Sequence, residues 1–307
     1  LFTSRPVGDA MATTIWGTSS SWTLTALPLF VWMGEILFRT KLSENLFAGL
    51  SPWMQKLPGG LIHVNVVGCA LFAAISGSSA ATVATVGKMS IPELRKRKYP
   101  EKILLGSLAG SGTLGLLIPP SIILIIYGVT VQESIAKLFI AGIIPGIMIA
   151  LIFMSYVIIW SLINKKSMPK YVENFSFLEK IRKSKQLLPV IILISAVIGS
   201  IYTGVATATE AASLGVVGAL ILSYFQKSLT IETFKQSLLG ATKTSCMIAF
   251  ILAGSTFLSL AMGFTGLPRN LAIWIQNMEL SPYVLIFVLM IFYIILGMFL
   301  DGISAVV

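Results

Sequence analysis

Two long apolar stretches, residues 61–87 and 103–127, are each interrupted in the middle by residues that break a helix. The first contains Gly77–Ser79, and the second contains Gly112–Gly115 followed by Pro119-Pro120. Open backbone within a bilayer is tolerated only where it is buried in protein or lines a wet cavity. Secondary transporters hold ions and anionic substrates at such interruptions. The two interruptions therefore predict an ion or substrate site.

The composition indicates a helical membrane protein. Hydrophobic residues make up 56% of the 307 residues, charged residues only 11%, and the mean hydropathy is +0.90. A soluble domain is about a quarter charged, and the apolar stretches have the length of membrane helices rather than barrel strands. We therefore expect an all-α polytopic fold with spans at residues 22–38, 61–87, 103–127, 138–163, 187–202, 208–225, 243–263 and 282–307.

The basic residues are clustered between the apolar stretches. Of the 22 lysines and arginines, 16 lie within residues 88–102, 165–185 and 227–243. This is the positive-inside pattern of cytoplasmic loops. It favours contact with anionic membrane lipid over binding of nucleic acid, despite the net charge of +10.

This topology makes the first broken stretch a re-entrant hairpin. Arg39 and Lys41 place residues 39–60 inside, so residues 61–87 leave and return on the cytoplasmic side, with a tip near Gly77. If residues 61–87 were one straight span, this arrangement would be lost.

The order of a span, a short amphipathic helix and a broken stretch occurs twice. Residues 44–57 and 267–279 each carry a tryptophan, which predicts interfacial helices. Trp53 precedes Gly77 by 24 residues, and Trp274 precedes Gly297 by 23. Since the second copy enters from the opposite side, we expect an inverted repeat, with residues 1–225 as the first unit and 226–307 as the start of the second.

The tip of the first hairpin is a candidate sodium site. Glycine allows a tight turn, hydroxyls and freed carbonyls suit sodium, and a helix N-terminus just after the tip favours a carboxylate. The alternative is close packing of small residues between helices. The candidate residues are Gly77, Ser78, Ser79 and Thr82.

The second interruption is expected to be an unwound helix paired with that tip. Its two prolines remove two backbone donors, which would leave carbonyls near Gly115 and Leu116 open to a cation. The alternative is a simple kink. The candidate residues are Gly112, Thr113, Gly115, Pro119, Pro120 and Ser121.

Three acidic residues lie in or near apolar stretches. Asp301 lies between Gly297 and Gly302 in the second broken stretch. We expect Asp301 and these two glycines to contribute to a cation site. Glu210 is expected to cap a helix with Thr207 or Thr209, and Glu35 to pair with Arg39 four residues later.

Other chemistry has little support in the sequence. Cys69, Cys246 and the single histidine, His63, suggest no disulfide framework or transition-metal site, and His63 is expected to pack at the membrane interface. No nucleotide-binding loop is present. We therefore expect no enzyme and no cofactor other than sodium as the coupling ion.

Several segments together resemble the large membrane subunit of TRAP transporters (tripartite ATP-independent periplasmic transporters, DctM family). The matching segments are residues 59–61, 72–82, 91–94, 112–121 and 138–146, with further similarity at 28–30, 33–37 and 297–301.

The resemblance implies an elevator-type carrier with two inverted repeats and two re-entrant hairpins, in a bacterial inner membrane. It also implies sodium-driven uptake of carboxylates such as C4-dicarboxylates or sialic acids, delivered by a periplasmic substrate-binding protein, with a small transmembrane subunit bracing the carrier. The resemblance also implies that the ion and substrate sites are formed by the tip of the first hairpin, by the unwound helix paired with it, and by Gly297, Asp301 and Gly302 of the second hairpin.

Two departures from the family pattern are visible. Ala208 stands where the family usually has proline. A second Gly-Thr…Pro-Pro break is absent after the second hairpin, so we expect that this chain does not transport alone. Because the chain starts at Leu1 and ends within an apolar stretch at Val307, we also expect a fragment that is cut at both ends.

The sequence leaves three other functions open. One is a secondary transporter of similar fold that works without a binding protein. A channel would lack saturable, sodium-coupled accumulation. A membrane enzyme would have to use Asp301, Glu210 or His63, whose spacing supports no catalytic pair.

Overall fold

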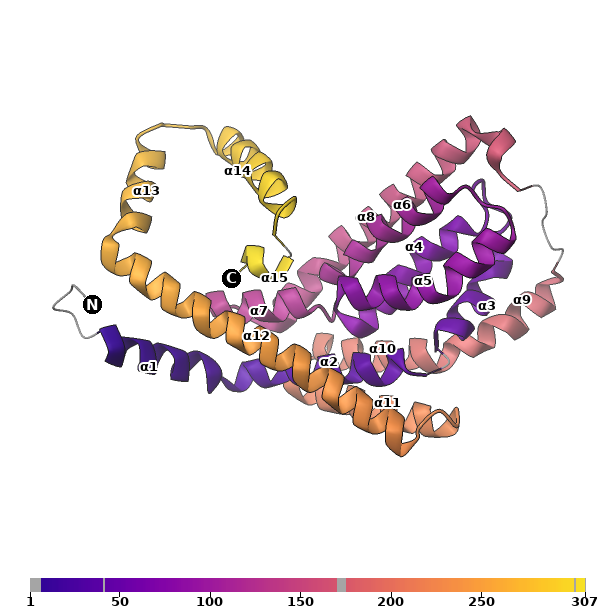
Figure 1. Cartoon of the computed structure of the whole chain (residues 1–307), viewed down its shortest axis with the longest axis horizontal. Coiled ribbons are helices and arrows are strands. Elements are labelled where there is room, and N and C mark those ends of the chain that lie inside the picture. Colours follow the sequence, from indigo (N-terminus) through magenta and orange to yellow (C-terminus); the bar gives the residue numbers. More distant parts are fainter. Residues whose placement is uncertain (1–6, 41, 170–174, 301, 307) are drawn as a thin grey trace.

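The structure, a computed structural model, describes residues 7–40, 42–169, 175–300 and 302–306. Helices connected by turns account for these residues, and no strand occurs among them (Figure 1). The α-helices are α1 Val7–Ser19, α2 Ala26–Phe38, α3 Leu42–Met54, α4 Ile62–Ser76, α5 Ser79–Lys96, α6 Glu101–Gly112, α7 Ile122–Val131, α8 Ile135–Ile163, α9 Phe177–Ser184, α10 Leu188–Tyr202, α11 Ala208–Phe225, α12 Ile231–Thr265, α13 Leu267–Gln276, α14 Pro282–Gly297 and α15 Gly302–Val306. Short 3-10 helices are η1 Trp22–Thr25, η2 Thr113–Leu116, η3 Lys165–Ser167 and η4 Lys185–Leu187.

Four helical segments of the described chain are long and apolar enough to cross a membrane. They are α8, the continuous segment 177–202, α11 and α12, and residues 8–38 form a further candidate that is bent by 52°. The all-α, multi-pass architecture expected from the sequence is therefore confirmed. Helices α4, α7 and α14 are apolar but shorter.

Helix α4 lies at the centre of the fold. It packs against α2, α3, α5, α6 and α8 (Figure 1). Apolar residues occur on all its faces, as is typical of a buried helix, and Val66, Cys69 and Phe72 are fully buried. His63 is also fully buried, with its Nε2 2.8 Å from the carbonyl oxygen of Pro58. His63 is therefore enclosed by protein, and its expected place at the depth of the membrane interface stays a prediction.

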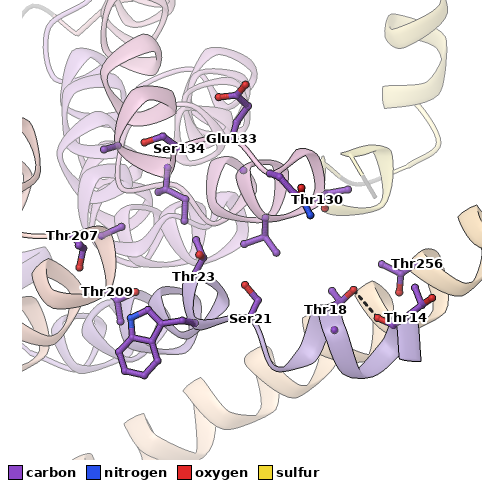
Figure 2. A pocket seen from close by; sticks show the side chains of 18 of the residues that line it. Thr14, Thr18, Ser21, Thr23, Thr130, Glu133, Ser134, Thr207, Thr209 and Thr256 are labelled. Atoms are coloured by element: carbon purple, nitrogen blue, oxygen red, sulfur yellow. Dashed lines mark hydrogen bonds between the residues drawn. The ribbon is translucent and has the colours of Figure 1, made fainter. Parts of the chain in front are cut away.

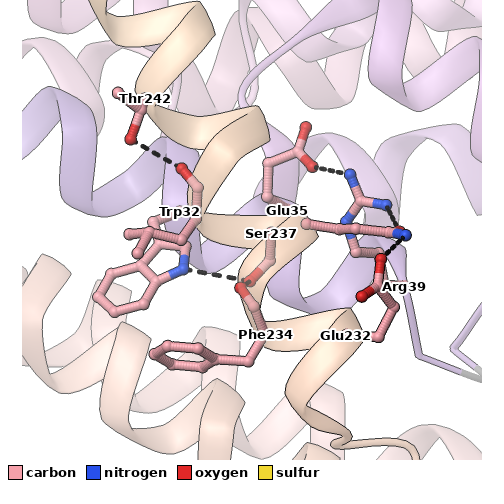
Figure 3. Close-up of polar contacts among 9 residues, drawn as sticks. Trp32, Glu35, Arg39, Glu232, Phe234, Ser237 and Thr242 are labelled. Carbon is pink, nitrogen blue, oxygen red and sulfur yellow. Dashed lines mark hydrogen bonds and ion pairs between the residues drawn. The ribbon is translucent and has the colours of Figure 1, made fainter.

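A second group of helices surrounds α2, which packs against α11 and α12. The expected ion pair is confirmed: the Arg39 guanidinium lies 3.0 Å from the Glu35 carboxylate (Figure 3). Arg39 also donates to Gln236 of α12 at 3.0 Å. One helical turn away from Glu35, the Trp32 indole N–H donates to the Ser237 hydroxyl at 3.3 Å. These polar contacts fix the register between α2 and α12.

Several helices extend beyond the limits expected from the apolar pattern. Helix α5 continues to Lys96, well into the basic segment 88–102, and α12 begins at Ile231, inside the basic segment 227–243. In α12 the reason is local, because Thr230 and Thr233 form a capping box that starts the helix before its apolar part. Helix α1 was not expected, since its sequence is rich in threonine and glycine, and it packs against α12.

The two short amphipathic segments are helical where the sequence predicts them, as α3 and α13. Trp53 of α3 donates to the Ser184 hydroxyl at 2.8 Å, which ties α3 to the end of α9. No residue of α13 is buried. Helix α14 is similarly exposed along its length (Figure 1).

Removing the Phe72 ring should destabilise the fold. Because Phe72 is fully buried in α4, Phe72→Ala leaves a cavity and should cost roughly 3 kcal/mol or more. Phe250→Ala is a matched control, since Phe250 of α12 is 83% exposed. Thermal unfolding in detergent should show a clear fall in Tm for Phe72→Ala only. Equal effects would contradict the central position of α4.

Candidate ion and substrate site

The break between α4 and α5 is a tight turn of two residues. Gly77 ends α4 in the left-handed conformation, with φ 58° and ψ 7°, and Ser78 is extended. An L side chain disfavours that conformation, whereas glycine adopts it freely. The chain then folds back: a Cβ atom built on Gly68 would lie 3.5 Å from Val86, and these residues are equally far from Gly77. Helices α4 and α5 thus form a helical hairpin with Gly77–Ser78 at its tip.

The break between α6 and α7 is longer. Helix α6 ends at Gly112, η2 follows, and regular structure resumes only at Ile122, after Pro119 and Pro120. A proline lacks the N–H that would bond the carbonyl four residues earlier. The Ser121 hydroxyl replaces one such donor, because it donates to the Leu116 carbonyl at 2.6 Å. This bond uses one of the two lone pairs of the Leu116 carbonyl oxygen, and the expectation that this carbonyl binds a cation stays a prediction.

The two breaks contact each other through their backbones. The Ile122 N–H donates to the Gly77 carbonyl at 3.3 Å. A Cβ atom on Gly77 would lie 2.8 Å from the Pro120 oxygen, and one on Gly115 would lie 2.9 Å from the Ser78 oxygen. Such distances leave no room for side chains at these two glycines. The structure thus brings the predicted tip and the predicted unwound segment together.

Hydroxyl groups concentrate at the hairpin tip. The Thr82 hydroxyl donates to the Ser78 carbonyl at 2.7 Å and lies 2.9 Å from the Ser76 hydroxyl. Thr82 is fully buried, and Ser76 is 6% exposed. Sequence reasoning did not select Ser76 as a site residue, although it directly precedes the Gly77 turn. Hard oxygen donors of this kind suit an alkali cation better than a soft transition metal.

The other candidate residues of the first two breaks divide into two groups. Gly112, Pro119, Pro120 and Ser121 are buried at the junction, and Ser79 is partly exposed at the start of α5. Thr113 is exposed, and its hydroxyl donates to the Gly110 carbonyl at 2.7 Å. The structure therefore places Thr113 outside the hydroxyl cluster at the tip.

The electrostatics of the junction come mainly from helix ends. Helix α5 begins at Ser79 and α7 begins at Ile122, and the Gly77–Ile122 bond shows that these N-termini are close. The N-terminus of a helix carries partial positive charge and favours an anionic group. The end of α4 at Ser76 supplies partial negative charge nearby. The junction therefore places the partial positive charge of two helix N-termini beside the partial negative charge of one helix C-terminus.

The second broken stretch reaches the same region only in part. Gly302, at the start of α15, packs against α7, since a Cβ atom there would lie 2.5 Å from Ile123 and 3.3 Å from Leu116. Gly297 ends α14, and a Cβ atom there would meet nothing within 4 Å. Asp301 lies outside the described residues, so its expected role stays a prediction.

Glu210 has the structural role expected from the sequence. Its carboxylate accepts from the Thr207 N–H at 2.8 Å, and the Thr207 hydroxyl accepts from the Glu210 N–H at 3.3 Å. Thr207 rather than Thr209 is therefore the capping residue of α11. The reciprocal bonds form a capping box, which stabilises a helix N-terminus.

A large polar cavity elsewhere was missed by sequence reasoning. It has a volume of about 760 Å³ and lies between the end of α1, the α7–α8 connection and the start of α11. Figure 2 shows Thr18, Ser21, Thr23 and Thr209 among the residues around it. The threonine- and serine-rich segment 13–25 was the available signal. None of the predicted site residues lines this cavity.

Comparison with known proteins decides the family. The model of the family described as "Tripartite ATP-independent periplasmic transporter, DctM component" matches residues 1–307, the whole chain. The chain belongs to the DctM family. It is therefore a transport protein and not an enzyme, as the residue pattern predicts.

Among the described residues, no group of three His, Cys, Asp or Glu could hold a metal ion.

Several relatives in the family carry different substrate names. The chain is 32% identical to the C4-dicarboxylate TRAP transporter large permease protein DctM of Pseudomonas aeruginosa, covering 95% of this chain and 68% of that protein. It is 31% identical to the sialic acid TRAP transporter large permease protein SiaM of Vibrio cholerae, covering 94% and 67%. It is 32% identical to the 2,3-diketo-L-gulonate TRAP transporter large permease protein YiaN of Escherichia coli, covering 95% of this chain and 68% of that protein. This chain thus spans about two thirds of the length of these relatives.

A methyl group at the tip should disrupt the junction. In Gly77→Ala the new Cβ atom would lie 2.8 Å from the Pro120 oxygen at a positive φ, and the strain should cost about 1–3 kcal/mol. Gly254→Ala is the control, because a Cβ atom at Gly254 in α12 would meet nothing within 4 Å. Thermal unfolding in detergent should show a lower Tm for Gly77→Ala and an unchanged or raised Tm for Gly254→Ala. A Tm unaffected by Gly77→Ala would contradict the contact between the two breaks.

Proposed function

We propose that this chain forms the ion- and substrate-binding part of a sodium-coupled carrier of organic anions. The contact between the Gly77–Ser78 tip and the 113–121 break is the observation that carries this proposal. It gathers hydroxyls, backbone carbonyls and two helix N-termini at one place. Sodium would bind the oxygen atoms, and the anionic group of the substrate would face the helix N-termini.

The substrate class follows from the same electrostatics. The predicted site residues within the described chain include no basic side chain that would demand a doubly charged ligand. Helix ends and hydroxyls suit one carboxylate with polar substituents. The relatives named for C4-dicarboxylate, sialic acid and 2,3-diketo-L-gulonate support an organic acid as the substrate. We infer a carboxylate, with its remaining groups recognised outside the junction.

The transport step would move the hairpin across the membrane. In this proposal α4–α5 is re-entrant and travels with α6 and α7, while α2, α11 and α12 form the scaffold. The division agrees with the packing, since α4 packs against α5 and α6, whereas α2 packs most extensively against α11 and α12. Gly302 beside Leu116 and Ile123 would bring the second inverted repeat, within 226–307, to the same site.

Membership of the DctM family supports a proposal for the partners and the location. We propose a bacterial inner-membrane complex in which a small transmembrane subunit braces this chain and a periplasmic binding protein delivers the substrate. The family description names a tripartite, ATP-independent and periplasmic system. The basic clusters would meet anionic lipid on the cytoplasmic face.

Sodium-driven uptake by the assembled transporter tests the proposal. The full-length subunit, its small subunit and its binding protein would be reconstituted in liposomes, and uptake of a labelled carboxylate measured with and without an inward sodium gradient. We expect saturable accumulation that requires sodium. Ser79→Leu should reduce it to the level of empty liposomes, because the larger side chain fills the tip.

Ser213→Leu provides the matched control, since Ser213 is exposed on α11. It should leave uptake within about twofold of the unmodified transporter, as is usual for surface changes of under 0.5 kcal/mol. Both variants should insert into the membrane in equal amounts. Normal uptake by Ser79→Leu, or non-saturable flux without sodium, would contradict the proposed site.

A further inference from the structure

A second cavity lies at the opposite end of α4 from the Gly77 tip. It has a volume of about 560 Å³ and is bounded by residues 55–60, by Tyr99, and by residues at the end of α8. Residues 55–60 connect α3 to α4, and Tyr99 lies between α5 and α6. The basic clusters place all three of these connections on the cytoplasmic side. The cavity therefore opens where the chain meets the inner leaflet.

The charges around this cavity are positive and unbalanced. Lys56 and Lys165 line it from two different connections, and no acidic residue is among the lining residues. Within the described chain, neither lysine forms an ion pair with a carboxylate. Two ammonium groups at one polar pocket attract an anion carrying negatively charged oxygens, such as a phosphate.

A hydroxyl group within the cavity adds a directed donor. The Tyr99 oxygen accepts a hydrogen bond from the Leu61 N–H at 3.1 Å, so the oxygen is held in place. A tyrosine hydroxyl, with an ordinary pKa of about 10, keeps its proton at neutral pH, and burial raises the pKa of Tyr99 further. With its oxygen already serving as an acceptor, the hydroxyl proton can point toward an anionic oxygen in the cavity.

The cavity continues onto an apolar surface. Leu162 lines it and is 47% exposed, and the adjacent Ile163 is 77% exposed. Both belong to the last turn of α8, a helix long and apolar enough to span the membrane. An occupant with a polar head and long apolar chains would fit both surfaces, whereas a free anion would use only the polar one.

We propose that this cavity binds the head group of an anionic phospholipid from the cytoplasmic leaflet. The ammonium groups of Lys56 and Lys165 and the Tyr99 hydroxyl hold the phosphate, and the acyl chains lie along the end of α8. Since residues 57–60 lead directly into α4, the bound lipid anchors the base of the α4–α5 hairpin. This lipid site is separate from the transport site and stands without it.

Native mass spectrometry of the purified chain in detergent tests the proposal. Titration with phosphatidylglycerol should show one tightly held lipid, and phosphatidylcholine should not compete for it. The double variant Lys56→Gln/Lys165→Gln should weaken phosphatidylglycerol binding by about 30-fold. Each lysine near an anionic lipid surface contributes about 1 kcal/mol of binding free energy, and the loss of two such contributions corresponds to this factor in affinity.

The control removes the same charge from the same side of the protein. Lys88 and Lys102 are exposed and do not line the cavity, so Lys88→Gln/Lys102→Gln should change the affinity by less than about threefold. Circular dichroism would verify that both double variants are folded. Equal weakening in both would show general charge attraction only and would overturn the proposal, as would unchanged binding in the cavity variant.

Inorganic phosphate separates a lipid from a free anion. We expect millimolar phosphate to displace little phosphatidylglycerol, because phosphate lacks the acyl chains that contact α8. Displacement of the lipid by phosphate at micromolar concentration would overturn the proposal, since the cavity would then bind a soluble anion.

Discussion

The backbone contact between the Gly77 turn and the 113–121 break determines how the central helices are arranged. It forms only because Gly77 and Gly115 lack side chains, which would approach Pro120 and Ser78 to below 3 Å. The contact places the ends of four helices, α4 to α7, at one junction. Helix ends carry unsatisfied backbone groups and partial charges. In the proposed function, an interruption that would destabilise an isolated membrane helix becomes the place where an ion and a carboxylate bind.

Much of the fold was predictable because membrane helices have a simple sequence pattern. The break at Gly77, the unwound segment before Ile122 and the two amphipathic helices all occur where the sequence places them. The sequence-based predictions of helix limits were wrong where a polar segment is nevertheless helical. Helix α1 is too polar to recognise by hydropathy, and α12 begins within a basic segment because the Thr230 capping box initiates it. Tertiary packing and capping, which local apolarity does not reveal, decided these limits.

The candidate site was predictable at the level of segments and less so at the level of atoms. Sequence spacing identified the two breaks, but it could not show that Ser121 donates to the Leu116 carbonyl. Nor could it show that Thr113 is exposed, because the direction of a side chain in an unwound segment depends on neighbouring helices. The cavities at Ser21 and at Tyr99 were missed for a similar reason, since each joins connections that are far apart in the sequence.

The most direct measurement of the central claim is the sidedness of the α4–α5 hairpin in the membrane. Single cysteines would replace Pro58 and Lys98, both exposed and flanking the hairpin, after Cys69→Ala and Cys246→Ala remove the native thiols. A membrane-impermeant thiol reagent would be applied to right-side-out and inside-out vesicles. We expect both positions to react only from the cytoplasmic side, as a re-entrant hairpin requires. Reaction from opposite sides would show that residues 61–96 cross the membrane once, and would contradict the proposed site.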